Sequence, residues 1–314
     1  MHLLRTWVTE GCNAFCPHCM NINSRSNYQM DTFRFEQMCK YFQDNGFDTI
    51  SIMGGEPTIH PDFEKIMSLA QSHFSIVYLF TNGLNSHTLK KYKPRENDTI
   101  IYNSLFINKW IPGTLMLKNK GKRIIDVVIN QHTKVDLLTR TLLKLLYASN
   151  GQPEIQLTID NSTNIFLHRA IIAKNINEVY DQLVTKYHAQ VTFQCGAPMC
   201  FTYGLKLPPY VPRAICPQEA VLVDGNFDVR FCNIQTDKLI NLFNNNDLIP
   251  FHILKNHIYL QSYKNQQIVL DKICRYCLLY GIQCNGKCHV SQNKIKAIDI
   301  INNTSLPWIK QLHI

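Results

Sequence analysis

Three cysteines near the start of the chain have the type and spacing of metal ligands. The segment reads Cys12-Asn13-Ala14-Phe15-Cys16-Pro17-His18-Cys19, so the gaps between thiols are three residues and then two. A short loop carrying three thiolates can hold one face of an iron–sulfur cube and leave one iron open for a small chelating cofactor. A zinc knuckle is the alternative, but structural zinc takes four ligands, and His18 adjoins Cys19, which strains that geometry.

A glycine pair followed by an acid forms a second motif, Gly54-Gly55-Glu56-Pro57. It ends an alternating segment in which Ile50 and Ile52 are apolar. Glycines at the end of a strand let the backbone approach a ligand closely, and a glutamate there can accept hydrogen bonds from a ligand ammonium. The alternative is an ordinary Gly-Gly turn with a solvated glutamate before a helix.

Most of the remaining cysteines lie in the last third of the chain. The chain has 12 cysteines and no basic-then-apolar start typical of a signal peptide, so metal or redox use is favoured over a disulfide scaffold. The late set comprises Cys216, Cys232, Cys274, Cys277, Cys284 and Cys288. Taken alone, the pairs in this set would suit a zinc ribbon.

The elements that position these motifs alternate along the first half of the chain. Strands are predicted at 7–9, 49–53, 76–80, 99–102, 124–129 and 155–159, and the apolar run 76–80 is typical of a strand buried on both faces. Helical stripes lie between them, one capped by Asp31 or Thr32 and another with Pro61 at its first position. This order predicts parallel βα units, with too few strands for an eight-stranded barrel.

Together, CxxxCxxC after the first strand and GGEP after the second closely resemble the radical S-adenosylmethionine (radical SAM) superfamily. The resemblance covers roughly residues 3–160. It implies an α/β fold with a partial (β/α)6 barrel and a 4Fe-4S cluster on Cys12, Cys16 and Cys19. The open iron would bind the amine and carboxylate of S-adenosylmethionine. Reductive cleavage would then give methionine and a 5′-deoxyadenosyl radical that abstracts a substrate hydrogen.

The resemblance also implies further contacts to S-adenosylmethionine. Gly54, Gly55 and Glu56 should meet the methionyl amine, and His18 occupies the place where the family often has an aromatic residue near adenine. Other candidates follow predicted strands, whose carboxyl ends face the active site in parallel barrels. They are Asn82, Asn103 or Ser104, and Asn130. Each of these is equally suited to be a turn residue.

The late cysteines resemble a SPASM/twitch extension, which carries one or two auxiliary 4Fe-4S clusters. The predicted domains are therefore a barrel over 1–190 and a small cysteine-rich domain over 191–314. With two clusters, which we favour, one would use Cys216, Cys232, Cys288 and either Cys195 or Cys200. The other would use Cys274, Cys277 and Cys284, with an open or non-cysteine fourth site. With one cluster, the ligands would be Cys216, Cys232, Cys274 and Cys277. No cysteine follows Cys288, which departs from the usual pattern.

Three single residues have open roles. Cys195 suits a cluster ligand, a hydrogen-atom donor or a buried thiol. Asp160, after the sixth predicted strand, is a candidate general base or substrate contact, although a turn aspartate fits equally. Cys39 lies on an apolar helical stripe and is predicted to be a core residue.

The leading functional hypothesis is a radical SAM enzyme that crosslinks or epimerises a ribosomally synthesised peptide. The alternative is a dehydrogenase or epimerase of a small molecule, such as a sugar alcohol or a nucleotide-linked metabolite. The chain starts at its first strand, so an N-terminal leader-binding domain is not expected, which weakens the peptide hypothesis. Flavodoxin or ferredoxin is the expected electron donor.

Charge and hydropathy limit the other partners. The net charge of +9 is spread along the chain with no basic–aromatic cluster, so nucleic acid is not an expected partner. No apolar run reaches the roughly 18 residues of a membrane span. The protein is expected in the cytoplasm.

Overall fold

The computed structural model describes residues 3–16, 19, 26–109, 121–148, 153–160, 168–193, 220–230 and 238–266. These residues form two compact units. The first contains the described residues of 1–125 and 218–265, and the second those of 126–217 and 266–314. Strand β5 (Lys122–Ile129) runs along the chain from the first unit into the second.

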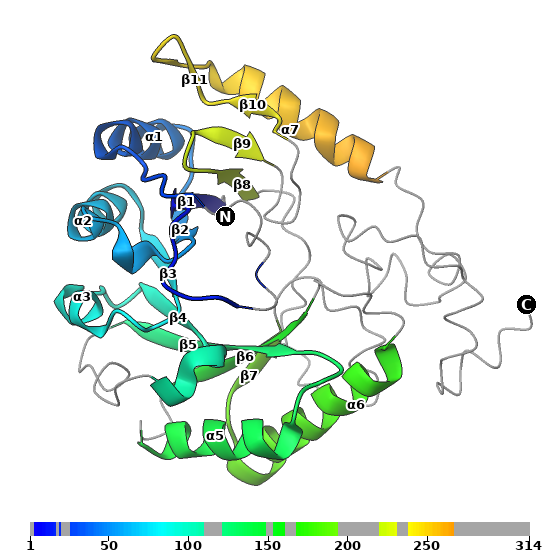
Figure 1. The fold of residues 1–314 in the computed structure, drawn as a ribbon. Coiled ribbons are helices and arrows are strands. Elements are labelled where there is room, and N and C mark those ends of the chain that lie inside the picture. The colour runs from blue at the N-terminus through cyan, green and yellow to red at the C-terminus, as the bar shows by residue number, and fades with distance from the viewer. Residues whose placement is uncertain are drawn as a thin grey trace, which may run out of the picture. The chain divides into compact units, whose positions relative to one another are not determined.

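The first unit is built on parallel strands. They are β1 (Leu3–Thr9), β2 (Thr49–Gly54), β3 (Ile76–Thr81) and β4 (Thr99–Asn103). The connecting helices are α1 (Thr32–Asp44), α2 (Phe63–His73) and α3 (Ser86–Lys91), which lie along the same face of these strands (Figure 1). The predicted parallel βα units are confirmed here.

Local signals explain where the helices begin. Asp31 caps α1 as predicted, because its side chain accepts a hydrogen bond from the Arg34 N–H at 2.9 Å. The apolar stripe of α1 is buried and includes Cys39, so the prediction of a core cysteine is confirmed. Helix α2 begins at Phe63, not at Pro61, because a turn precedes it and Asp62 is its N-cap. The prediction for Pro61 was therefore wrong by two positions.

Strand β3 corrects a second expectation. Val77, Leu79 and Thr81 are buried, whereas Tyr78 and Phe80 are only partly buried. The continuous apolar run had predicted burial on both faces. The observed alternation instead shows that helix packing covers one face and leaves the other for partly accessible side chains.

A hairpin from late in the chain extends the sheet beyond β1. Strand β8 (Ala220–Val223) pairs in parallel with β1, and β9 (Asp228–Arg230) pairs antiparallel with β8. The sheet order in this unit is β10-β9-β8-β1-β2-β3-β4, with β10 at Ile240–Asn241. Residues 220–230, from the segment predicted as a separate domain, thus belong to the same sheet as β1, the strand that leads into the cysteine loop. The short strands β11 (Phe243–Asn244) and β12 (Asp247–Leu248) and helix α7 (Phe251–Gln266) follow.

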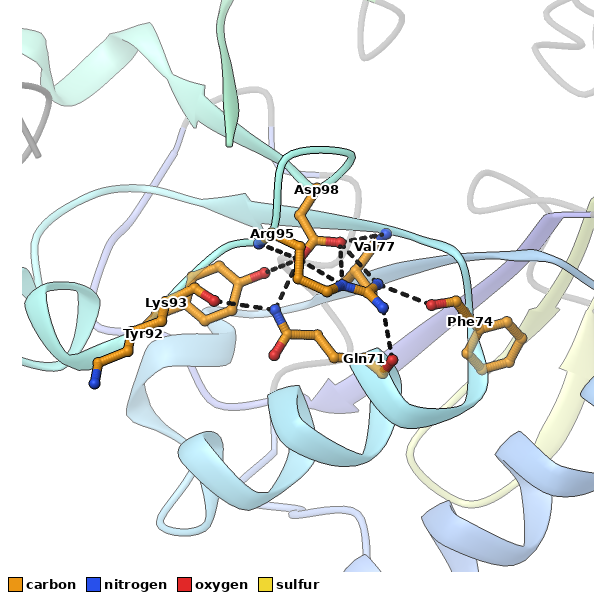
Figure 2. A network of polar contacts seen from close by, with 7 residues as sticks. All are labelled: Gln71, Phe74, Val77, Tyr92, Lys93, Arg95 and Asp98. Atoms are coloured by element: carbon orange, nitrogen blue, oxygen red, sulfur yellow. Dashed lines mark hydrogen bonds and ion pairs between the residues drawn. The ribbon is translucent and has the colours of Figure 1, made fainter. Parts of the chain in front are cut away.

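A buried carboxylate fastens the amino ends of β3 and β4. The Asp98 side chain is fully buried and pairs with the Arg95 guanidinium at 2.9 Å (Figure 2). It also accepts hydrogen bonds from Gln71 Nε2 at 2.7 Å and from the backbone N–H of Val77 at 3.2 Å. Because these donors come from α2, β3 and the loop before β4, one side chain joins three elements.

The second unit repeats the βα pattern. It contains the end of β5, then β6 (Glu154–Ile159) and β7 (Val191–Phe193), adjacent in that order, with β6 and β7 parallel. Helices α5 (Val135–Ala148) and α6 (Arg169–Tyr180) accompany them, and α6 continues as a π-helical turn, η3 (Asp181–Lys186). All six strands predicted up to residue 160 are present. Within the described ranges, every helix is too short or too polar to cross a bilayer.

Candidate functional site

The cysteine loop leaves the carboxyl end of β1 and is closed at its base. The chain returns antiparallel to β1, with a bridge between Thr9 and Gln29. The Met30 N–H donates to the Val8 carbonyl at 2.9 Å, and the Glu10 N–H donates to the Tyr28 carbonyl at 3.1 Å. These bonds hold both ends of the loop at the carboxyl edge of the sheet.

All three loop cysteines are partly exposed thiols. The Cys19 N–H donates to the Cys16 carbonyl at 3.1 Å, so the backbone groups of the second and third cysteines are in contact. Three thiols on one short loop are a donor set suited to an iron–sulfur cluster. In the described part of the chain, no three His, Cys, Asp or Glu side chains are gathered closely enough to hold a metal ion. Convergence of the three thiols on one cluster therefore stays a prediction.

The glycine pair at the end of β2 is pressed against the base of this loop. A Cβ on Gly54 would lie 2.2 Å from the Thr9 carbonyl oxygen, and one on Gly55 would lie 2.0 Å from the Gly11 carbonyl oxygen. Gly54 also has φ +140°, which side chains disfavour. Since real Cβ atoms do not approach oxygen so closely, both positions require glycine. The structure thus supplies a packing reason for the motif in addition to the predicted approach of a ligand.

Backbone hydrogen bonds fasten the same contact. The Gly55 N–H donates to the Thr9 carbonyl at 2.8 Å, and the Glu56 N–H donates to the Gly11 carbonyl at 2.9 Å. The Gly54-Gly55-Glu56 segment and the start of the cysteine loop therefore form one hydrogen-bonded piece at the carboxyl edge.

Glu56 is buried, with 1% of its surface exposed. Its Oε1 accepts hydrogen bonds from Thr58 Oγ1 at 2.6 Å and from Thr81 Oγ1 at 2.7 Å, and also from the Thr58 N–H. Its Oε2 accepts from the Asn82 N–H at 2.6 Å. The alternative of a solvated turn glutamate is therefore wrong. The side chain caps the turn η1 (Pro57–Ile59) and ties it to the end of β3.

The charge state of Glu56 follows from this environment. Burial raises the pKa of the carboxyl, and the hydrogen bonds from Asn82, Thr58 and Thr81 offset only part of that rise. All four donors are neutral groups. An ammonium placed beside this carboxylate would favour its ionised form.

Asn82, the residue after β3, connects Glu56 with the cysteine loop. Its side-chain amide donates to Asn13 Oδ1 at 2.8 Å and lies 4.0 Å from Cys12 Sγ. The sequence predicted Asn82 as a contact to S-adenosylmethionine. It gave no indication of the link to Cys12, because residues 12 and 82 meet only through the pairing of neighbouring parallel strands.

The candidates after β4 lie at the predicted strand end. Asn103 is the last residue of β4, and its Oδ1 accepts a hydrogen bond from the Leu105 N–H at 3.0 Å. Ser104 begins the 3-10 turn η2 (Ser104–Lys109). Both have the local geometry of turn residues, and their contact with a cofactor stays a prediction.

In the second unit, Asn130 and Asp160 are brought together at the ends of β5 and β6. Asn130 Nδ2 donates to Asp160 Oδ2 at 3.2 Å, and the Asp160 N–H donates to the Ile129 carbonyl at 3.0 Å. Asp160 is buried. The pairing agrees with the rule that functional polar side chains lie at the carboxyl ends of parallel strands. It gives Asp160, the candidate general base or substrate contact, an amide hydrogen-bond partner.

Asp126, in the middle of β5, is a polar group that the sequence reading missed. It is partly buried and accepts a hydrogen bond from Thr158 Oγ1 on β6. Burial raises its pKa to about 6, although the bond from Thr158 acts in the opposite direction. The available signal was a single acid inside the apolar run 124–129.

Several predicted site residues lie outside the described residues. They are His18, Cys195, Cys200, Cys216, Cys232, Cys274, Cys277, Cys284 and Cys288. The described neighbours of Cys216 and Cys232 are the strands β8 and β9. Those strands form an antiparallel hairpin, in which Leu222 pairs with Arg230, so the chain enters and leaves at the same end.

Comparison with known proteins finds matches in the first part of the chain. Residues 8–103 match the radical SAM superfamily. Over 81 residues, the chain is 31% identical to the mycofactocin maturase MftC of Mycobacterium ulcerans (strain Agy99), a match covering 25% of this chain and 22% of the relative. MftC of Mycobacterium tuberculosis (strain ATCC 25618 / H37Rv) matches over 81 residues at 31% identity, covering 21% of its length. The aligned part thus spans about a fifth of these relatives.

Solved structures share the fold over most of the chain. Streptococcus suis SuiB bound to S-adenosylmethionine matches with a TM-score of 0.63 and 16% identity, covering 92% of this chain and 73% of SuiB. Native anSMEcpe with bound AdoMet and Cp18Cys peptide matches with a TM-score of 0.62 and 16% identity, covering 98% of this chain and 97% of that one. At this identity the likeness supports the α/β fold with a parallel sheet.

Proposed function

Because residues 8–103 match the radical SAM superfamily, we propose that the chain is a radical SAM enzyme that modifies a ribosomally made peptide. The observation that carries this proposal is the joining of two motifs at the carboxyl edge of the sheet. Gly55 and Glu56 bond to Thr9 and Gly11, at the start of the loop that bears the three cysteines. A cluster-binding loop and an amine-binding segment with this relation would let one ligand contact both.

Each of these elements has a proposed task. Cys12, Cys16 and Cys19 would hold a 4Fe-4S cluster, which together with S-adenosylmethionine supplies a 5′-deoxyadenosyl radical for hydrogen abstraction. The backbone of Gly54 and Gly55, held tightly against the loop, would orient the methionyl amine. Glu56 would supply the negative charge behind that backbone. Its burial makes it a positioning group first, and a direct bond to the ammonium would need the one remaining acceptor site on Oε2.

The second unit has a proposed place in substrate binding. Asp160 is proposed to contact substrate or take up a proton, and its bond from Asn130 would fix its orientation. Asn130, and in the first unit Asn103 or Ser104, are each proposed as a contact to S-adenosylmethionine. A peptide substrate is supported by the solved relatives, since one SuiB structure holds the precursor peptide SuiA and anSMEcpe holds a peptide.

We also propose auxiliary clusters in the late part of the chain. Cys216 and Cys232 flank the β8–β9 hairpin in sequence, and an antiparallel hairpin brings its two flanking segments to one end. This supports assigning both cysteines to one cluster. The other proposed ligands are Cys274, Cys277, Cys284 and Cys288, with Cys195 or Cys200. A flavodoxin or ferredoxin in the cytoplasm is the proposed electron donor.

The first experiment tests radical SAM chemistry. Anaerobically reconstituted protein is mixed with S-adenosylmethionine and dithionite, and 5′-deoxyadenosine and methionine are quantified. We expect both products in equal amounts, and none from the variant with Cys12, Cys16 and Cys19 replaced by Ala. The Cys39→Ala variant is the matched control, because that thiol is buried on the apolar face of α1 and is not part of the cysteine loop. A triple variant that still cleaves would contradict the assignment of the loop.

The second experiment tests the substrate class. A peptide encoded beside the gene is added to the same reaction and its mass is followed. A crosslink should lower the peptide mass by two units. An epimerisation should leave the mass unchanged in ordinary water and add deuterium when the reaction is run in heavy water. If cleavage persists while no encoded peptide gains deuterium or loses hydrogen, the peptide assignment is refuted and a small molecule becomes the substrate.

A further inference from the structure

Asn82 is held in one conformation by bonds at both ends of the residue. Its backbone N–H donates to Glu56 Oε2 at 2.6 Å. Its side-chain Oδ1 accepts a hydrogen bond from the Leu84 N–H at 2.9 Å. The residue is 6% exposed and is followed by Gly83 at φ +74°, which completes the tight turn.

These bonds decide which way the amide points. Because the Leu84 N–H requires an acceptor, Oδ1 must face that side and the NH₂ group must face the other. On that other side lie Asn13 Oδ1, at 2.8 Å, and Cys12 Sγ, at 4.0 Å. The amide therefore directs a hydrogen-bond donor toward the first thiol of the cysteine loop.

We infer that Asn82 is a positioning residue for Cys12 that raises the reduction potential of the cluster this thiol would hold. The inference rests on the proposed function, since it needs a cluster on Cys12. Hydrogen bonds to ligand sulfurs tune iron–sulfur potentials. A donor stabilises the thiolate more when the cluster carries the extra electron, so it favours the reduced state.

The chemistry of the position favours asparagine. The residue must accept from the Leu84 N–H and donate toward Cys12 on the same short side chain, which an amide does and a carboxylate does not. Aspartate in this place would keep the turn but put a negative charge beside the sulfur. Asn82→Asp therefore removes the donor and opposes reduction of the cluster, while the side chain keeps its size and shape.

The chain offers a matched control three residues later. Asn85 lies in the same segment, and its amide donates to the Thr58 carbonyl at 2.7 Å. Asn85→Asp introduces the same charge on the same loop, but the altered group is bonded to η1. A difference between the two variants thus reports the contact with Cys12 and not the net charge.

The experiment measures the midpoint potential of the cluster bound by the Cys12 loop, by redox titration of the reconstituted proteins. Removal of the bond in Asn82→Ala should lower the equilibrium constant for one-electron reduction about three- to tenfold. At 59 mV per tenfold, this is a shift of roughly 30–60 mV toward lower potential. Asn82→Asp should shift it further, and Asn85→Asp should leave it within about threefold of the wild type.

Equal potentials in the wild type, Asn82→Ala and Asn82→Asp would overturn the inference. Iron content and melting temperature are measured on each protein to exclude misfolded samples. If both Asn82 variants fail to fold, the inference is tested by spectroscopy on the wild-type protein. Asparagine labelled with nitrogen-15 only in its side-chain amide should give a nitrogen coupling to the reduced cluster in pulsed electron paramagnetic resonance. Absence of that coupling would refute the contact.

Failure of the proposed function is recognised separately. A wild-type protein that binds no reducible cluster on the Cys12 loop would refute the radical SAM assignment before Asn82 is tested. A wild type that binds the cluster and cleaves S-adenosylmethionine, with potentials unchanged by Asn82 substitution, would refute the role of Asn82 alone.

Discussion

Each end of strand β3 donates a hydrogen bond to a buried carboxylate from elsewhere in the chain. The two carboxylates differ in the groups that offset the cost of burying them. Asp98 accepts from Val77 near the amino end, and Glu56 accepts from Thr81 at the carboxyl end. Arg95 lies against Asp98, whereas the donors around Glu56 are hydroxyls and backbone N–H groups. The same strand thus joins a charge-paired carboxylate to a carboxylate held by neutral donors.

The electrostatic consequence is opposite in sign. At Asp98, burial alone would raise the pKa, but the hydrogen bonds from Arg95 and Gln71 and the Arg95 charge hold it below its usual range. At Glu56, burial dominates and the pKa stays raised. A carboxylate that is already paired favours stability, whereas one held by neutral donors would gain from a cationic ligand. The amino edge therefore has the character of a structural fastening and the carboxyl edge that of a binding site.

The largest expected effect is at the amino edge. Asp98→Ala leaves the Arg95 guanidinium, Gln71 and the Val77 N–H without their shared acceptor. We expect a loss of about 3–5 kcal/mol in the free energy of unfolding, because breaking a buried pair strands its partners. Denaturant titration measures this loss. The folded fraction should still bind S-adenosylmethionine with the wild-type affinity. A loss of affinity in the folded protein would contradict the purely structural role of the amino edge.

At the carboxyl edge we expect a smaller loss of stability and a loss of binding. Glu56→Gln places an NH₂ group where only donors surround it, which costs about 1–3 kcal/mol. If the lost charge also served the ammonium, about 1.5–3 kcal/mol of binding energy disappears and affinity for S-adenosylmethionine falls roughly 10- to 150-fold. Calorimetric titration at full iron content measures the affinity, and thermal melting measures the stability.

The two readouts separate the possible roles of Glu56. A purely structural tie would lower the melting temperature with little change in affinity. A direct ligand contact would lower affinity with little change in melting. No change in either would remove Glu56 from the site.

Asp126 extends the comparison to a third carboxylate, whose one hydrogen-bond donor among the described residues is the Thr158 hydroxyl. Its pKa rises from the usual 3.8 to about 6, so the folded state binds the proton more tightly than the unfolded state. Stability from this group is therefore present below about pH 4 and is lost as pH rises through 6. Relative to wild type, Asp126→Asn should gain about 1–2 kcal/mol between pH 4 and 7. Melting temperatures across this pH range test the trend, and parallel curves for the two proteins would contradict it.

The smallest expected effect comes from trimming one donor of Glu56. Thr81→Val removes the hydroxyl that bonds Oε1 and also accepts from the Gly83 N–H. We expect a loss of about 0.5–1.5 kcal/mol, typical of one hydrogen bond. Thr139→Val is a suitable control, because its buried hydroxyl in α5 makes no hydrogen bond among the described residues. A larger loss in the control would show that β-branched replacement itself is the cause.

Short-range patterns in the sequence determined the elements and the main motifs. The helical stripe of α1 and its Asp31 cap, and the alternation in β6, follow from side-chain periodicity and local hydrogen bonding. The CxxxCxxC loop and the Gly-Gly-Glu segment were identified because their chemistry lies within a few consecutive residues. The start of α2 was misplaced because proline suits a turn before a helix as well as its first position.

Only the tertiary structure decided which residues meet across the sheet. Asn82 lies 4.0 Å from Cys12, Asp98 pairs with groups from α2 and β3, and β8 lies beside β1. The two residues of each such contact are far apart along the chain, and their meeting depends on strand order and register. Burial of Glu56 and the raised pKa of Asp126 have the same origin, because the polarity around a side chain is set by elements that its own sequence neighbourhood does not contain.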